Sequence, residues 1–112
     1  MGDMLRFDPI TPDGRPSLSV SFVRMLPEDV TVANVSTECI VHPESLVADA
    51  SADERLEGSP IVQDDDQTVS QFFSGGIADV DYIITWIATY SDGEIEPVDT
   101  LLSVRAYKNV GA

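Results

Sequence analysis

The residues most able to do chemistry are one cysteine, one histidine and several closely spaced carboxylates. Cys39 and His42 are the only residues of their kinds and lie three positions apart. Side chains on a strand alternate between two faces, so this odd spacing points the two in opposite directions. We therefore expect no Cys/His nucleophile, no metal site and no intrachain disulfide. Alternation groups Cys39 with Val35 and Val41, which predicts a buried apolar position for its side chain.

The carboxylates give weak support for catalysis. Asp79 with Asp81, or Glu94 with Glu96, could lie close enough for a hydrolase, but carboxylates at strand ends usually serve solvation. The three acids at 64–66 resemble part of a calcium loop, yet they lack the spaced ligands and the glycine that such loops need. No nucleophile elbow, P-loop or dinucleotide fingerprint occurs. We predict a protein that is not an enzyme and that binds no cofactor and no metal.

Charge and composition narrow the classes of partner. The 112 residues suit one domain, and 20 acidic against 6 basic residues give a formal net charge of −14. Such a surface repels phosphate backbones and anionic lipids, so we expect no nucleic acid and no membrane as partners. The acidic surface serves either solubility or docking onto a basic partner. The amino terminus lacks the pattern of a signal peptide, so we expect synthesis in a cytoplasm.

The stretch 82–90, YIITWIATY, is the strongest strand signal, and the turn signal at Asp92-Gly93 follows it. Alternation places one set of large side chains on a single face. We predict that this face lies in the core together with Cys39; its members are Tyr82, Ile84, Trp86 and Ala88. Tyr82 opens the strand, as in the tyrosine corner of immunoglobulin-like sandwiches, which predicts a buried ring with its hydroxyl bonded to nearby backbone.

Further alternating segments predict strands over 17–22, 31–42, 60–62, 68–73 and 98–107. Short strands at this spacing, with little helix, favour an all-β, immunoglobulin-like antiparallel β-sandwich, with a barrel as the alternative. We assign residues 17–108 to one such domain.

The remaining segments are turns, an arm and one ambiguous stretch. Ser74-Gly75-Gly76 predicts a turn, because glycine allows positive φ. Residues 1–16 are rich in proline and predict an irregular N-terminal arm, either free or lying across a neighbouring subunit. For segment 43–58 the sequence supports two alternatives equally: one or two helical turns, or a loop with a weak strand.

The outer face of the central strand predicts an interface. Ile83 and Ile87 point away from the core set, and Leu101 and Tyr107 of the last strand belong to the same side. A solvent-facing sheet usually carries charge instead. We expect either another subunit or segment 43–58 to cover this apolar strip.

The segment VSQFFSGGIADVDYIITWIATYSDG resembles the carboxyl-terminal half of small immunoglobulin-like proteins of tailed-phage virions, and LPEDVTVANVS is similar to the same family upstream. The resemblance extends over about 26–107 and is weaker before 68. The chain differs in a longer acidic insertion at 44–66 and in its proline-rich arm. The matching residues belong to turns and strands: Ser74, Gly75, Gly76, Tyr82, Thr85, Thr89, Ser91, Asp92 and Gly93.

This resemblance implies a structural protein of a virion that attaches fibre to tail, or connects parts of the tail or neck. The implied partners are other virion proteins, namely tail, portal, neck or fibre subunits, with several copies per particle. A capsid decoration protein is the alternative within the same class. A receptor- or carbohydrate-binding immunoglobulin-like module is the alternative of a different class, and it predicts exposed aromatic side chains on loops.

Overall fold

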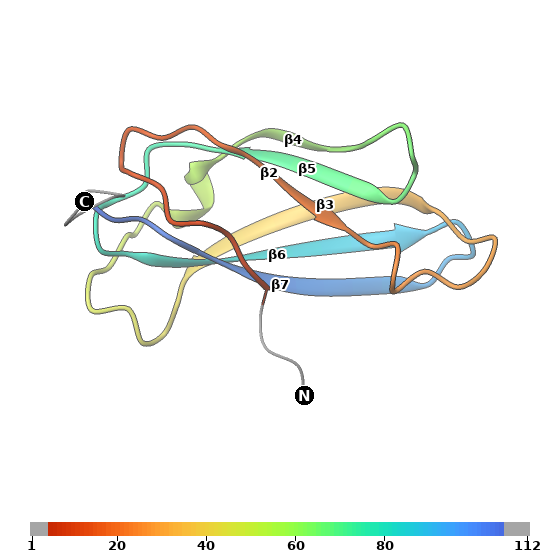
Figure 1. Ribbon diagram of the computed structural model, residues 1–112. Coiled ribbons are helices and arrows are strands. Elements are labelled where there is room, and N and C mark those ends of the chain that lie inside the picture. Colours follow the sequence, from red (N-terminus) through yellow and green to blue (C-terminus); the bar gives the residue numbers. More distant parts are fainter. Residues whose placement is uncertain (1–4, 107–112) are drawn as a thin grey trace.

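The computed structural model describes residues 5–106, which form two packed β-sheets (Figure 1). The first sheet has the order β1-β7-β6-β3 and the second the order β2-β5-β4. All pairs are antiparallel except β1 with β7. The predicted all-β sandwich is confirmed. The elements are β1 (Leu5–Arg6), β2 (Ser17–Ser21), β3 (Val32–Val41), the 3-10 helix η1 (Ala52–Arg55), β4 (Leu56–Val62), β5 (Thr68–Phe73), β6 (Asp81–Tyr90) and β7 (Ile95–Ser103).

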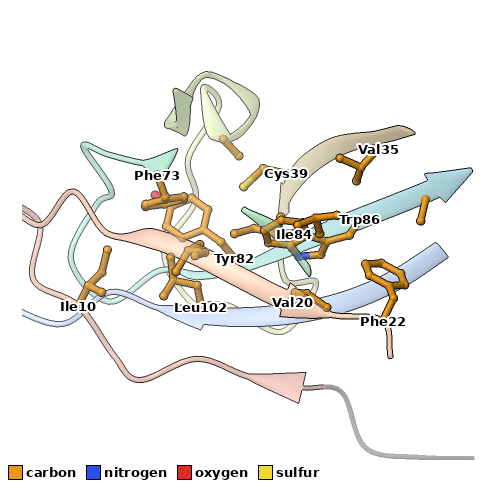
Figure 2. Close-up of a cluster of buried hydrophobic side chains, with 14 of the residues drawn as sticks. Ile10, Val20, Phe22, Val35, Cys39, Phe73, Tyr82, Ile84, Trp86 and Leu102 are labelled. Carbon is orange, nitrogen blue, oxygen red and sulfur yellow. The ribbon is translucent and has the colours of Figure 1, made fainter. Parts of the chain in front are cut away.

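Strand β6 lies between β3 and β7, and its side chains alternate between buried and half-buried along its whole length. The inner side chains have no exposed surface up to position 88, because the second sheet packs over them (Figure 2). Cys39 of β3 is 3% exposed and lies in the same core. The structure thus buries every predicted core residue, namely Tyr82, Ile84, Trp86, Ala88 and Cys39.

Three aromatic side chains on the inner face of β6 organise the core. Each packs against one phenylalanine from another part of the chain, with ring centroids 5.1–6.4 Å apart. Tilted and edge-on pairs of this kind are favourable beyond the area they bury. The second sheet and the N-terminal segment are therefore both anchored on β6. The pairs are Phe73 with Tyr82, Phe7 with Trp86, and Phe22 with Tyr90.

The predicted hairpin turn at Asp92-Gly93 is present, whereas residues 74–76 form an irregular link and the turn lies just after it, at 78–79. Gly93 has a φ of 91° in the hairpin between β6 and β7, where its N–H donates to Tyr90 O, and Asp92 Oδ1 accepts from Glu94 N. Gly75 has a φ of 74°. Gly76 is needed for a different reason: a Cβ there would lie 2.7 Å from Val104 Cγ2.

The prediction of a free N-terminal arm is wrong for residues 5–16. Leu5 and Arg6 form β1 beside β7, and Ile10 bridges Val104 and is buried. Phe7 packs against the core and donates its N–H to Leu101 O. Backbone pairing of so few residues needs no alternating sequence, so composition alone did not reveal it. The described part of this segment belongs to the sandwich, and it lies on its own chain.

Segment 43–58 combines the two structures that its sequence left open, a helical turn and part of a strand. It holds the short helix η1 and then enters β4, which begins at position 56 and not at 60 as predicted. The pairing of β4 with β5 shifts register between Glu57 and Ile61, around Gly58 with its φ of 75°. Glycine and proline inside this strand resembled a loop because they occupy an irregular edge.

Candidate functional site

Cys39 and His42 do not form a reactive pair. Burial, followed by the nearby Asp49 carboxylate, raises the pKa of the Cys39 thiol to about 12, so the nucleophilic thiolate is suppressed. His42 lies past the end of β3, where its Nδ1 accepts a hydrogen bond from the Glu44 N–H at 3.0 Å. Each side chain thus has a local structural explanation.

The candidate carboxylates are dispersed among turns and strand ends. Asp81 bonds to Arg105 at 3.0 Å, and Asp79 adopts a φ of 68° in the turn before β6. In the acidic turn at 64–66, Asp65 accepts from the N–H groups of Gln67 and Thr68. Within residues 5–106 no group of three or more His, Cys, Asp or Glu side chains is placed to hold a metal ion.

A buried polar cluster closes one end of the sandwich. The Tyr82 hydroxyl accepts a hydrogen bond from Ile77 N at 3.0 Å and donates one to Asp49 Oδ2 at 2.7 Å. Asp49 also accepts from Arg55 Nε at 2.9 Å, and its side chain is only 3% exposed. The predicted backbone bond of Tyr82 is present. Asp49 and Arg55 belong to the ambiguous segment 43–58, and no periodic pattern in the sequence marks them.

The electrostatics of this cluster favour fixed charges. Hydrogen bonding to Arg55, aided by the bonds from Tyr82 and Ser51, lowers the pKa of Asp49 to about 2. Burial, together with the bond to Asp49, raises the pKa of Tyr82 to about 12. Neither group titrates near neutral pH, as a general acid or base would. The cluster therefore fastens segment 43–58 to the start of β6.

The outer face of the four-stranded sheet holds the predicted apolar strip. Ile40, Ile83 and Leu101 lie side by side on β3, β6 and β7. A second row, farther along the strands, joins Ser36, Ile87 and Pro97 by the same register. Ile83 and Ile87 are half-buried, as expected for side chains flanked by neighbouring strands.

Ile40 and Leu101 change the predicted composition of this strip. Ile40 is 55% exposed and was missed, although the alternation of β3 itself points it outward. Leu101 was predicted to be exposed, but it is 8% exposed because β1 extends the sheet beside it and aligns Arg6 with it. Tyr107 lies outside the described residues.

An acidic row separates the two apolar rows. Glu38, Thr85 and Asp99 align across β3, β6 and β7, and the Thr85 hydroxyl bonds to Asp99 Oδ1 at 2.6 Å. Glu38 and Asp99 are exposed. We name the three rows together the outer strip: Ile40–Ile83–Leu101, Glu38–Thr85–Asp99 and Ser36–Ile87–Pro97. It combines apolar contact area with a central negative charge.

Segment 43–58 was one of the two expected covers for this strip. It instead crosses from β3 to the second sheet, and its Asp49 and Arg55 reach Tyr82 on the inner side of β6. Ile83 and Ile87 keep part of their surface exposed. A cover from another subunit remains the expectation.

No family model, curated protein or solved structure matches this chain. Among residues 5–106, no helix has the length and apolar character needed to span a bilayer.

Proposed function

We propose that this protein is a non-enzymatic structural component of a tailed-phage virion, an adaptor or connector of the tail or neck, and that it binds its neighbour through the outer strip. The observation that carries the proposal is the strip itself, in which Ile40, Ile83 and Ile87 keep apolar surface accessible on a sheet face of a chain whose net charge is −14. The resemblance in the segments around 69–93 and 26–36 supplies the virion context.

The strip favours a partner of definite chemistry. Its apolar rows flank Glu38 and Asp99, so a complementary patch has apolar side chains on both sides of a lysine or arginine. Burying the apolar rows would supply the affinity, while the acidic row would select the register. The acidic remainder of the chain would attract a basic partner surface over a longer distance.

We also propose that the sandwich is immunoglobulin-like. The strand orders β1-β7-β6-β3 and β2-β5-β4, with β1 parallel to β7, support this. The hydroxyl of Tyr82, bonded to the backbone just before its strand, is a second supporting feature. Tail adaptors and capsid decoration proteins would share such a scaffold, so the choice between them depends on the partner.

The test is binding of the purified chain to candidate tail, neck, portal and capsid proteins, followed by size exclusion with light scattering. We expect a complex of fixed stoichiometry with one of the tail or neck proteins. Ile40→Glu should abolish it, whereas Ile61→Glu on the other sheet should not. The two isoleucines are matched, at 55% and 56% exposed.

Two results would overturn the proposal. Binding to capsid shells alone would replace the adaptor with a decoration protein. Equal loss of binding in the Ile40→Glu and Ile61→Glu variants, with both still folded by circular dichroism, would exclude the outer strip as the interface.

The receptor- or carbohydrate-binding alternative has one observation in its favour. Phe72 is 48% exposed on the outer face of the second sheet, beside a pocket of about 230 Å³. Hydroxyl and amide side chains contribute to its lining: Ser17, Ser59, Ser70 and Gln63. Retention of the chain on glycans, lost in Phe72→Ala, would favour this function over the adaptor.

A further inference from the structure

The part of the sandwich formed by residues 5–106 has four strand edges, and three of them carry features that oppose pairing with another chain. Strand β1 has only two residues. Strand β3 shifts register between Val32 and Asn34 and exposes Glu38. Strand β4 contains Gly58, with positive φ, and Pro60. Short edges, bulges, charges and prolines are the usual protections against edge-to-edge association.

Strand β2 has none of these protections. Its five residues, SLSVS, pair with β5 in unbroken register, and they contain no charge, proline or glycine. Leu18 and Val20 are buried, whereas the three serines are exposed. Figure 1 shows β2 beside β5 as the last strand of the three-stranded sheet. It is therefore a regular and uncharged edge.

Alternate residues of β2 present their backbone hydrogen-bonding groups away from β5. Pro16 O accepts from Phe73 N and Phe22 N donates to Gln67 O, so the even-numbered positions bond toward β5. In an antiparallel ladder the alternate residues face the opposite side. The N–H and C=O groups of Ser17, Ser19 and Ser21 consequently point outward from the sheet.

The sequence around β2 lacks the acidic side chains that dominate the chain as a whole. Residues 14–27 contain no acidic side chain and two arginines, Arg24 and Arg15, of which Arg15 forms an ion pair with Glu57 of β4, although the whole chain has 20 acidic residues. Two copies of a protein with net charge −14 repel each other over most approaches. At this edge they can meet without bringing carboxylates together, which favours a second copy as the occupant.

The strand is also complementary to itself. We propose that two copies of this chain pair β2 with β2 in antiparallel orientation about a twofold axis at Ser19, which joins the two three-stranded sheets into one continuous sheet. Ser17 then lies opposite Ser21 of the partner subunit, and Leu18 opposite Val20 of the partner subunit. Every outward N–H and C=O of the three serines gains a partner, and the apolar residues stay on the core side.

This pairing uses a different surface from the outer strip, so it can fail or succeed independently of the proposed function. Light scattering and sedimentation of the full chain should give a species of twice the 12.1 kDa chain mass. Ser19→Glu places two carboxylates opposite each other at the axis, and we expect it to weaken the dimer about 100-fold. Ser36→Glu, at another exposed serine on the edge strand β3, should leave the dimer intact.

Cross-linking gives a second measurement that needs no loss of function. Ser19→Cys should form a disulfide-linked dimer under mild oxidation, because residues paired across the axis bring their Cα atoms to about 5.5 Å. Ser36→Cys should not. A wild-type chain that stays monomeric at about 100 μM, well above the dissociation constants of specific dimers, would overturn the proposal. Dissociation by Ser36→Glu together with resistance to Ser19→Glu would overturn it as well and move the dimer contact to the outer strip.

Discussion

Tyr82 and Tyr90 lie at opposite ends of the same face of β6, and their hydroxyl groups differ in hydrogen bonding. The Tyr82 hydroxyl bonds to Ile77 N and to Asp49, which also binds Arg55. Tyr90 is 4% exposed, yet within residues 5–106 no hydrogen-bond partner is found for its hydroxyl. Burial, with smaller effects of Glu96 and Asp92, raises its pKa.

The difference follows from how the chain closes each end. At the Tyr82 end, segment 43–58 has to be fastened, and it contributes few buried side chains of its own. The buried Asp49 carboxylate holds this segment, because it accepts hydrogen bonds from both Tyr82 and Arg55. At the Tyr90 end, a tight hairpin needs no such fastening, and the ring packs edge-on against Phe22 at 6.4 Å. The tyrosine hydroxyl is therefore hydrogen-bonded at the end where the long segment 43–58 must be held. At the end closed by the short hairpin, apolar packing of the ring is sufficient.

Trp86 lies between the two ends and supports both, so its truncation should have the largest effect. Its ring is fully buried, packs against Phe7, and donates Nε1–H to Thr100 Oγ1 at 2.9 Å. We expect Trp86→Ala to reduce the free energy of unfolding by about 3–5 kcal/mol. Denaturant melts measure this. Stability near that of the wild type would contradict the assignment of this face to the core.

Acid should weaken the Tyr82 end selectively. The pKa of Asp49 is about 2 in the folded protein and about 3.9 in an unfolded chain. Because the folded value is lower, this contribution is complete above about pH 4 and is lost as the pH falls toward 2. It amounts to roughly 2 kcal/mol for this nearly buried carboxylate.

The other carboxylates require a matched control for this measurement. Their protonation relieves repulsion in a chain of net charge −14, which acts in the opposite direction. The quantity to compare is therefore the change in unfolding free energy between pH 4 and pH 2 in the wild type and in Asp49→Asn. Identical changes in the two proteins would show that Asp49 carries no linked proton.

Removing the Tyr82 hydroxyl tests the same end without changing its charge. Tyr82→Phe leaves the Ile77 N–H unpaired and removes one donor from the buried Asp49 carboxylate. We expect a loss of about 1.5–3 kcal/mol, the range for a hydrogen bond to a charged group. Denaturant melts again provide the readout, and hydrogen exchange of segment 43–58 should accelerate. If exchange in segment 43–58 were unchanged, the Tyr82 hydroxyl would not be what holds that segment in place.

Strands were predicted correctly from the sequence where the alternation of apolar and polar residues matches the buried and exposed faces of the strand. Strand β5 has the expected bounds, Thr68–Phe73, and β6 begins only one residue earlier than predicted. Alternation fails at Ala33. The odd-numbered positions of 31–42 would place it inward with Val35 and Cys39, but it is exposed because the register shift between Val32 and Asn34 moves it outward. A bulge has no reliable signature in an alternating sequence.

The site was predicted less completely than the fold, because its polar members depend on distant partners. Asp49 bonds to Tyr82 across 33 positions of sequence, and nothing periodic marks it. Ile83 and Ile87 of the outer strip were predictable from alternation on β6. Alternation also placed Leu101 on this face, but its burial was not predictable, because it depends on β1, a two-residue strand that joins β7 from the other end of the chain.

Tyr90→Phe should have the smallest effect, and it is the sharpest comparison with Tyr82→Phe. Both substitutions delete one buried hydroxyl from the same face of the same strand. Since the Tyr90 hydroxyl makes no hydrogen bond among the described residues, its removal loses no bond and relieves the desolvation of an unpaired polar group. We expect stability within about 0.5 kcal/mol of the wild type, or a small increase. A loss as large as that of Tyr82→Phe would mean that a partner, such as an ordered water, satisfies the hydroxyl and that both ends of β6 depend on polar fastening.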